Sequence, residues 1–490
     1  MKRSTFLVQP WGRLLLAAAV FAVVFSPKAA RSAEPQRALL AGAAASNITP
    51  PLGALVVGGW SPHPATHVHD ELFAKCLVLD DGKTRLVFVI CDNVGIPREV
   101  FDAAKQSIRE HTGIPVEHML MASDHTHSAA SARGEKRMAV SETLSDYQQF
   151  VATRISDGVR RAVNNLEPAR IGWGSASEPS QVFNRRWHLK PGTPIPNPFG
   201  GEDKVMMNPG RGSDRLLKPA GPTDPEIAFL SVQSTDGRPI ALVANYSLHY
   251  VGGVPGATIS ADYFGVFADR IQELLGADRL DPPFVAMMSN GTSGDVNNID
   301  FLGGSSRKAP FEKIREVADL VARDVFEAHK NIQFHDRVEL GAQQEELTLA
   351  VRKPTADETA YFQKVLAKGE DEKPYHVREK IYAQRAQDLA ESPDKVSVIL
   401  QAFRVGDVGI AAIPFEVFTE IGLEIKRECP LPKAFTISLA GGSYGYLPTP
   451  RQHALGGYET WLGTNNVQLD ASEKIVARLL AMFERLKQSQ

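Results

Sequence analysis

The sequence predicts a single large α/β domain in which mixed β-sheets are flanked by helices. Short apolar runs rich in β-branched residues alternate with amphipathic helical segments along most of the chain. Several of these runs end in loops of small and polar residues, as strands do at the ligand-binding edge of α/β sheets. No low-complexity tract or internal repeat interrupts the alternation. We therefore expect one core with its functional residues at strand ends.

Residues 1–33 are expected to be a secretory signal outside this fold. Three basic residues precede the apolar run 14–25, which is too short to span a bilayer comfortably. Cleavage is expected near Ala33, although Arg31 departs from the usual small-x-small pattern, and a retained membrane anchor is the alternative. We expect a secreted or periplasmic protein whose mature domain, residues 34–490, has no membrane span.

Composition and charge narrow the possible partners. The chain is 43% hydrophobic and 23% charged, which is typical of a soluble globular protein. Residues 1–33 carry five basic and no acidic side chains, so their removal moves the formal charge from -3 to -8 and argues against a nucleic-acid partner. The three cysteines, Cys76, Cys91 and Cys429, cannot all pair and form no C-x-x-C motif. The oligomeric state is left open.

The first half of the chain alternates predicted strands and helices. A hairpin is indicated where two apolar runs flank Asp80-Asp81-Gly82. Pro97 is expected to open a helix, because proline is favoured at the first helical position. The predicted elements are strands at 71–79 and 85–91, a helix at 97–111, a strand from Met119, a helix at 146–164 and a strand at 169–174.

The second half follows a Pro- and Gly-rich loop, residues 189–223, of the length that usually indicates a functional or disordered segment. Residues 355–394 are charged and are expected to form a solvated helical hairpin, an insertion without chemistry of its own. The other predicted elements are strands at 226–233, 239–246, 284–288, 396–405, 408–413 and 436–439, and helices at 262–275, 313–331, 416–428 and from Ser472.

The most informative stretch runs from Met119 to Ser128. Its apolar half is a predicted buried strand, and side chains alternate faces in an extended chain, so His125 and His127 are expected to point the same way. Two imidazoles at the carboxyl end of a strand suit a metal site. The alternative is a pair of hydrogen-bonded surface histidines. A second His-x-His, at residues 67–69, has no supporting partner and ranks lower.

Two later strands also end in polar residues. The strand 239–246 leads into Ser247-Leu-His249, which places another histidine at a strand end. The strand 284–288 leads into a loop of small residues that contains Asp295 and Asn297. Because such ends gather at one edge of a sheet, we expect these side chains to lie close together.

Together these segments resemble the neutral/alkaline non-lysosomal ceramidases, in their amino-terminal catalytic domain. The resemblance spans roughly residues 40–485, and its motifs occur in the family's order. The matching segments are His125-Thr-His127-Ser128, Asn184-Arg185, Ser247-Leu-His249 with Ile259-Ser-Ala-Asp262, Asn290 to Val296, Pro414-Phe-Glu416, Tyr444-Gly-Tyr446 and Tyr458-Glu459.

The resemblance implies a zinc ion that activates water for hydrolysis of an amide bond. The zinc ligands that it implies are His125, His249, Glu416 and Tyr446. The residues that it places around the reacting centre are His127, Arg185 and Tyr458, with Asp295 orienting a ligand histidine from behind. Arg185 is expected to contact substrate rather than to support the fold, the alternative being a solvated loop charge.

The chain departs from the family pattern in three places. Asn297 stands where the family has a nucleophilic serine, and Ser289 and Ser293 are out of register. An amide is not a nucleophile, so we expect attack by metal-activated water with Asn297 orienting substrate or water. The alternative is that Asn297 only satisfies loop backbone groups. The His-Thr-His-Ser motif continues with Ala129, and no immunoglobulin-like domain is expected after Tyr458.

These observations predict an exported zinc-dependent hydrolase that cleaves an N-acyl amide in a ceramide-like lipid or a small molecule. One alternative is a catalytically silent relative that binds a lipid or glycan. Another is zinc-dependent hydrolysis of an ester or phosphoester. The complete set of four implied ligands favours an enzyme, because burying such polar groups without a metal costs free energy.

Overall fold

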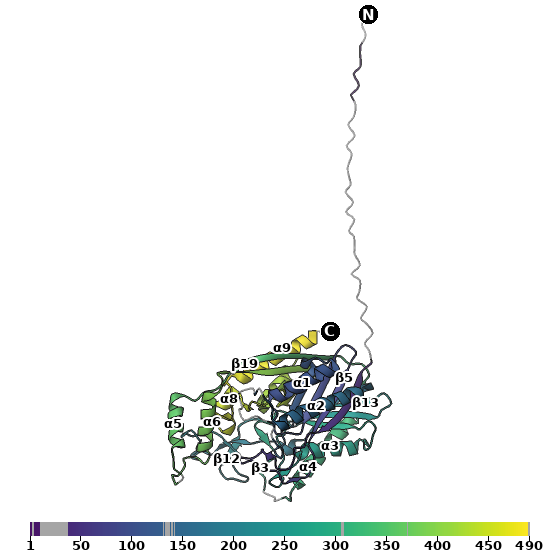
Figure 1. Ribbon diagram of the computed structural model, residues 1–490. Helices are drawn as coiled ribbons and strands as arrows, with labels where there is room; N and C mark the ends of the chain where they lie inside the picture. Colours follow the sequence, from purple (N-terminus) through teal and green to yellow (C-terminus); the bar gives the residue numbers. More distant parts are fainter. Residues whose placement is uncertain are drawn as a thin grey trace. The chain divides into compact units, whose positions relative to one another are not determined.

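The structure is a computed structural model that describes residues 1, 4–9, 38–130, 132, 138, 141, 143–304, 308–369 and 371–488. The chain divides into a short amino-terminal unit, residues 1–36, and a compact unit, residues 37–490 (Figure 1). The apolar run of the expected signal and its cleavage position lie outside the described residues. None of the described helices has the length and apolar character needed to cross a membrane.

The larger sheet contains nine strands among the described residues. Two neighbouring pairs, β6–β7 and β14–β16, are parallel and the other pairs are antiparallel, so the sheet is mixed as predicted. In spatial order the strands are β16 (Val285–Asn290), β14 (Pro239–Tyr246), β13 (Glu226–Ser234), β8 (Glu167–Ser177), β1 (Leu40–Asn47), β5 (Phe73–Asp80), β6 (Arg85–Cys91) and β7 (Met119–Ser123), with β18 (Phe334–His335) paired to β8.

A smaller, four-stranded sheet packs face to face on the larger one. Its strands are β19 (Leu340–Ala350), β20 (Lys395–Val405), β21 (Val408–Ile413) and β23 (Lys433–Ser438). Apolar side chains from both sheets form one buried cluster, in which the rings of Phe88 and Phe403 lie 5.6 Å apart. Burial of these inward-facing residues holds the two sheets together.

Helices cover the outer faces of both sheets. On the larger sheet, α1 (Arg98–Thr112) and α2 (Asp146–Asn164) pack over β1, β5 and β6, while α3 (Asp262–Leu274) and α4 (Glu312–His329) pack over β8, β13 and β16. On the smaller sheet, α7 (Thr419–Glu428) and α9 (Ala471–Gln488) pack over β19, β20 and β23. The predicted α/β class with helices flanking mixed sheets is confirmed.

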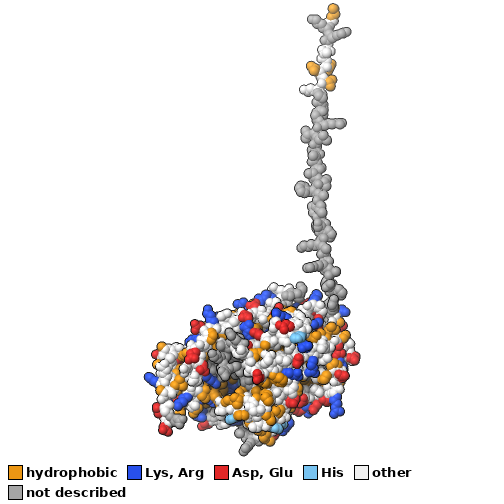
Figure 2. All heavy atoms as spheres, in the orientation of Figure 1, with side chains coloured by type: hydrophobic (Ala, Val, Ile, Leu, Met, Phe, Trp, Pro, Cys, Tyr) orange, Lys and Arg blue, Asp and Glu red, His pale blue; other side chains and the backbone are white. Residues whose placement is uncertain are grey.

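The charged segment 355–394 forms the predicted helical hairpin. Its helices, α5 (Ala356–Leu366) and α6 (Glu379–Glu391), pack against each other at the opposite end of the compact unit from β13 (Figure 1). Thr355 caps α5 by accepting a hydrogen bond from the Glu358 amide, and the Glu358 side chain accepts one from the Thr355 amide. Figure 2 shows acidic and basic side chains interspersed on the visible face of the molecule.

The helix predicted from Glu416 begins three residues later. Glu416 instead lies in a short strand, β22 (Glu416–Val417), which pairs in parallel with β24 (Tyr446–Leu447). The backbone amide of Glu416 donates to the Gly445 carbonyl, so it is hydrogen-bonded in this strand pairing rather than in a helix. The first helical amide, that of Thr419, donates to the Asp295 carboxylate, which satisfies the helix start from another loop.

Short elements complete the fold, and three of them lie in or next to the long loop 189–223. The short strands are β2 (Leu55–Val56), β3 (His63–Pro64), β4 (His67–Val68), β9 (Phe183–Asn184), β10 (Arg186–Leu189), β11 (Met206–Met207), β12 (Leu216–Pro219), β15 (Thr258–Ile259) and β17 (Val296–Asn297). The short helices are α8 (Pro450–His453) and the 3-10 turns η1 (Val116–His118), η2 (Pro179–Gln181) and η3 (Tyr458–Thr460).

Candidate metal centre

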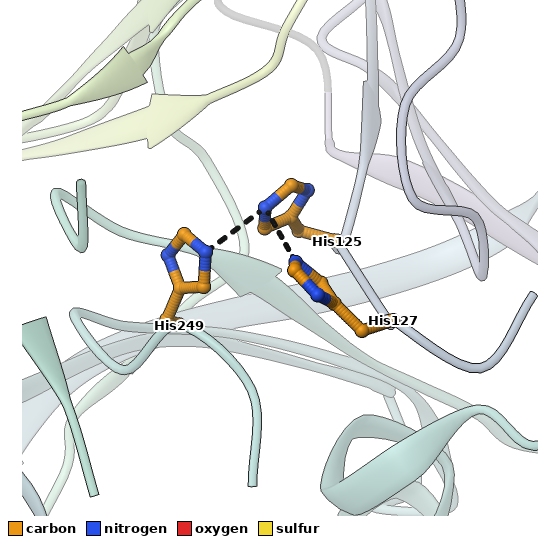
Figure 3. Close-up of side chains that lie close together, drawn as sticks. All are labelled: His125, His127 and His249. Carbon is orange, nitrogen blue, oxygen red and sulfur yellow. Dashed lines mark hydrogen bonds between the residues drawn. The ribbon is translucent and has the colours of Figure 1, made fainter. Parts of the chain in front are cut away.

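His125 is turned inward by the loop that follows β7. Its backbone has a left-handed conformation, with φ of 79°, which is uncommon for a residue other than glycine. The Asp124 carboxylate holds this turn by accepting hydrogen bonds from the amides of Asn93 and Thr126. His125 is only 2% exposed. The strand thus ends at Ser123, yet His125 and His127 still face a common centre (Figure 3).

His249 reaches the same centre from the end of β14, which lies parallel with β16 in the larger sheet. The side-chain amide of Asn290 donates to the backbone carbonyls of both Asp124 and His249. One asparagine at the end of β16 therefore ties together the two loops that carry His125 and His249. The predicted convergence of strand ends is observed in these loops.

Glu416 and Tyr446 approach from the smaller sheet. They follow β21 and β23, and they are direct partners in the parallel pairing of β22 with β24. The Tyr446 hydroxyl is hydrogen-bonded to the Glu416 side chain. The loop geometry after two parallel strands therefore places both residues beside the histidines.

The three histidine side chains converge on one point (Figure 3). The Nε2 atom of His125 lies 3.1 Å from that of His249 and 3.1 Å from that of His127. The Oε2 atom of Glu416 lies 3.4 Å from His125 Nε2 and 3.7 Å from His249 Nε2. The described structure thus brings together His125, His249 and Glu416, with the fourth implied ligand, Tyr446, hydrogen-bonded to Glu416 and with His127 as an additional neighbour.

Hydrogen bonds at the rear of two rings fix which nitrogens carry protons. His125 Nδ1 lies 2.6 Å from the Val94 carbonyl, and His249 Nδ1 lies 3.1 Å from the Ser293 carbonyl. A carbonyl only accepts, so both Nδ1 atoms must donate, and in the neutral rings both Nε2 atoms carry lone pairs. Two lone pairs facing each other beside a carboxylate repel, and a cation at their centre removes that repulsion.

The donor set fits a zinc ion. Ligands at about 2.0–2.1 Å from a tetrahedral ion are separated from one another by roughly 3.3 Å, close to the spacings among His125, His249 and Glu416. Imidazole nitrogens and a carboxylate oxygen are ordinary zinc ligands, and carbonyls behind ligand histidines commonly orient them. The Val94 and Ser293 carbonyls have this orienting position, which sequence reasoning did not identify.

Burial keeps the nearby ionisable groups in their neutral forms. It holds the pKa of His249 well below its usual range, and the positive charge of Arg185 acts in the same direction. Burial also raises the pKa of both Tyr446 and Tyr458, against the lowering effect of Arg185. A neutral imidazole is available as a ligand, and protonated phenols are available as hydrogen-bond donors.

The histidines open into a cavity of about 570 Å³. Its wall includes Glu416, Tyr446, Tyr458 and Arg185, as expected. It also includes Trp60 from the loop before β3, and Ile381 and Arg385 from α6. Helix α6 of the charged insertion therefore forms part of the cavity wall, a position that the sequence pattern did not predict.

Arg185 is buried rather than solvated. It is 5% exposed, its Nε donates to the Glu459 carboxylate at 2.8 Å, and its guanidinium carbon lies 5.3 Å from the centre of the Tyr446 ring. Glu459 also accepts from Arg186 at 2.7 Å. Arg185 borders the cavity, but the expectation that it has little structural role is wrong, because removing it would leave a buried carboxylate partly uncompensated.

Asp295 lies behind the site but makes no hydrogen bond to His125 or His249. Its carboxylate accepts from the amide and hydroxyl of Thr419, both at 2.9 Å, and from the Asn184 side chain at 2.9 Å. Burial raises its pKa to about 6. The expectation that Asp295 orients a ligand histidine is therefore not met, because the backbone carbonyls of Val94 and Ser293 lie behind the two histidines. The hydrogen bonds of Asp295 instead connect the Asn184-Arg185 segment to α7.

Asn297 lies in a neighbouring cavity of about 480 Å³. Its side-chain nitrogen donates to Asn208 at 2.7 Å, and its side-chain oxygen accepts from the Ile299 amide at 2.9 Å. Arg185, Asn208 and Tyr250 border both cavities. Asn297, at the position of the family's serine, therefore does not border the cavity of the histidines itself. It contacts that cavity's wall by its hydrogen bond to Asn208.

Comparison with solved structures agrees with this architecture. No family model matches the sequence. A neutral ceramidase from Pseudomonas aeruginosa superposes with a TM-score of 0.67 at 18% identity, covering 92% of this chain and 75% of that one. A ceramidase complexed with C2 gives a TM-score of 0.67 at 16% identity, covering 92% and 76%. The chain has the fold of these ceramidases, as the sequence motifs predicted.

Proposed function

We propose that this chain is an exported zinc-dependent hydrolase that cleaves the amide bond of an N-acyl substrate. The observation that carries the proposal is the convergence of the His125 and His249 lone pairs with the Glu416 carboxylate at the wall of a cavity. The ceramidase fold supports amide hydrolysis as the reaction. Export is supported by the sequence of residues 1–33 alone.

His125, His249 and Glu416 would hold the zinc ion, with Tyr446 as the fourth group. A zinc ion held there would supply a Lewis acid that polarises the substrate carbonyl and lowers the pKa of a water. Tyr446 is hydrogen-bonded to Glu416 and lies beside the Arg185 guanidinium, so it is held at the edge of the donor set. His127 stands next to His125 as an alternative ligand or a proton donor.

The chain's own residues would bind and polarise the amide. Tyr458 borders the cavity, and its ring lies 5.7 Å from that of Tyr446, so its raised pKa keeps a phenol proton available for a developing oxyanion. His127 faces the same space, stacked at 3.8 Å on the ring of Tyr250. Tyr458 and His127 would donate hydrogen bonds to the carbonyl oxygen of the substrate. His125, His249 and Glu416 would hold the zinc ion next to that oxygen.

Water is the nucleophile in this proposal. The Ser289 hydroxyl donates to the Ala244 carbonyl, and the Ser293 hydroxyl donates to the Asn290 side chain at 2.6 Å. Both serines are at most 3% exposed, so neither hydroxyl is directed at an incoming amide. Asn297 has no nucleophilic atom. No covalent acyl-enzyme is expected, and Asn297 positions Asn208 in the cavity wall.

The substrate is proposed to be a lipid or another small acyl amide. Aromatic and aliphatic groups from Trp60, Ile381 and Tyr458 line the cavity beside its polar floor, which suits a molecule with an apolar chain and a polar amide. Ceramide is one such molecule, and the neighbouring folds are those of ceramidases. Simpler N-acyl amides satisfy the same requirements.

The test is metal analysis of the purified full chain together with a panel of acyl amides and the matching acyl esters. We expect about one zinc per chain and hydrolysis of amides that is lost on chelation and restored by zinc. Zinc without hydrolysis of either class would favour a silent binding protein. Hydrolysis confined to the esters would replace the proposed amidase by an esterase.

A further inference from the structure

Helix α6 turns one face toward the cavity that contains the histidines. Arg378, at its amino-terminal cap, and Arg385 are seven residues apart, which is about two helical turns and therefore one face. Ile381 lies between them, and both Ile381 and Arg385 border the cavity. The helical insertion thus brings two guanidinium groups to the side of the proposed active site.

Neither guanidinium has a carboxylate within ion-pair distance among the residues that the structure describes. Each guanidinium lies over an aromatic ring: the guanidinium carbon of Arg378 lies 3.7 Å from the centre of the Trp60 ring, and that of Arg385 lies 5.0 Å from the centre of the Tyr382 ring. Other charges nearby are paired, as in Lys368 with Glu379 and Arg185 with Glu459. Both arginines are half-buried, so an anion reaching them meets less competition from water than it would at an exposed surface.

An aromatic wall connects these arginines with the metal centre. Trp60, under Arg378, contacts Tyr458 edge to face at 5.6 Å between ring centres. Tyr458 contacts Tyr446 in the same manner at 5.7 Å, and Tyr446 stacks on His249 at 6.4 Å. A substrate lying along this wall would have one end at the histidines and the other end at α6.

We propose that Arg385 and Arg378 bind an anionic group of the substrate, so that the preferred substrates are N-acyl amides that carry a carboxylate, phosphate or sulfate. The inference rests on the proposed function, because it treats the cavity as the substrate site of an amide hydrolase. Guanidinium groups recognise such anions through paired, charge-assisted hydrogen bonds. An anion also supplies the counter-charge that the described surroundings of the two arginines lack.

The position of Arg385 favours the substrate over a membrane surface as the source of the anion. Arg385 and Ile381 border the same cavity as His125 and His249, so an anion bound by Arg385 is within the space that the reacting amide occupies. A lipid surface held outside that space would need exposed charges only. The two sources nevertheless predict different results in one set of variants.

The experiment compares N-dodecanoylglycine with N-dodecanoylethanolamine, which share the acyl chain and amide but differ in a carboxylate. The variants are Arg385→Gln, Arg378→Gln and, as a matched control, Lys364→Gln, which removes an exposed positive charge from α5. We expect Arg385→Gln to lower kcat/KM for the acid about 10- to 100-fold, mainly through KM, as for loss of a charged hydrogen bond. The neutral amide should change less than about threefold, and Lys364→Gln should change neither.

Two results would overturn the inference. One is an equal loss on both substrates in Arg385→Gln. The other is loss of binding to phosphatidylglycerol vesicles in that variant while its preference between the soluble substrates is retained, which would assign α6 to a membrane surface. Circular dichroism and thermal unfolding of each variant identify any general loss of fold.

A separate readout covers the case in which the wild type hydrolyses neither amide. That result would contradict the proposed function, and calorimetric titration of N-dodecanoylglycine into the full chain would then test the anion site alone. Binding that weakens at least about tenfold in Arg385→Gln, with Lys364→Gln unchanged, supports the site. Equal binding by the wild type and Arg385→Gln contradicts it.

Discussion

The floor and the side wall of the cavity are built in different ways. The floor is formed by His125, His249 and Glu416, which stand at the ends of buried strands and are almost inaccessible to solvent. The side wall is formed by α6 and by the loop carrying Trp60, whose side chain is 44% exposed. The floor is thus fixed by two sheet cores, whereas the wall depends on one helical hairpin and one loop.

Under the proposed function, this difference separates chemistry from selectivity. Backbone carbonyls and sheet pairing hold the floor, so changes there remove the metal site or weaken the fold. Side chains on α6 can change with little effect on either core, which leaves the wall free to determine which substrate enters. Variants of the two regions should therefore differ in kind, and the following predictions test that separation in order of decreasing effect.

His249→Ala should have the largest effect. Removing one of the converging ligands leaves a site too weak to retain zinc during purification, so zinc content should fall from about one per chain to nearly none and hydrolysis to background. Elemental analysis and an acyl-amide assay measure both quantities. His67→Ala, in the other His-x-His motif, is the control and should keep its zinc. Equal zinc in wild type and His249→Ala would return residues 67–69 to consideration as the site.

Arg185→Ala should lower both stability and activity. The substitution leaves Glu459 buried with Arg186 as its remaining ion-pair partner, and we expect a loss of about 3 kcal/mol in the free energy of unfolding. Urea denaturation of the metal-loaded chain provides the measurement. Arg215→Ala, an exposed arginine of the long loop, should stay within about 0.5 kcal/mol of wild type. A melting temperature unchanged in Arg185→Ala would restore the sequence-based view of a purely substrate-binding arginine.

Asn297→Ala should have a moderate effect. It removes hydrogen bonds to Asn208 and to the Ile299 amide, which we expect to cost about 1 kcal/mol in stability and about tenfold in kcat/KM through the displaced Asn208. Asn298→Ala in the same loop is the matched control. Mass spectrometry of the enzyme with substrate should find no acyl group attached. An acyl adduct on Ser289 or Ser293 would contradict attack by water.

Asp295→Asn should change the pH dependence of stability more than its magnitude. The folded-state pKa of Asp295 is raised to about 6 from an ordinary value of 3.8, so the folded state holds this proton more tightly than the unfolded state. Stability from this group is present below about pH 4 and is lost as the pH rises through 6, by on the order of 3 kcal/mol. Urea denaturation between pH 4 and 7 should show a shallower decline in the variant. Some decline of stability with pH should remain in the variant, because burial also raises the pKa of Asp262 to about 6.

Sequence patterns were sufficient for the two histidines of the floor because local rules apply to them. Apolar runs that end in polar loops predicted the strands before His125 and His249, and sheet geometry then required those ends to meet. Glu416 and Tyr446 have no such local signal, and only the resemblance to ceramidases identified them. Their actual setting, as paired residues of β22 and β24, depends on a ladder between segments 30 positions apart.

The wall and the supporting contacts could not be predicted in this way. The charged pattern of residues 355–394 correctly predicted a helical hairpin, but periodicity does not show which part of the molecule a helix packs against. Arg185 appeared to be a loop charge because its partner, Glu459, is 274 positions away. Likewise, the carbonyls of Val94 and Ser293 carry no sequence signal, since every residue has a carbonyl group.

The position of the four candidate ligands has a consequence for the order in which the protein is made. Two of them follow strands of the larger sheet, and the other two, Glu416 and Tyr446, follow strands of the smaller one. A growing chain therefore has both histidines long before it has the carboxylate and phenol that complete the set. The full site forms only after residue 446 has been synthesised and the two sheets have joined, so stable capture of the proposed metal would be among the last events of folding.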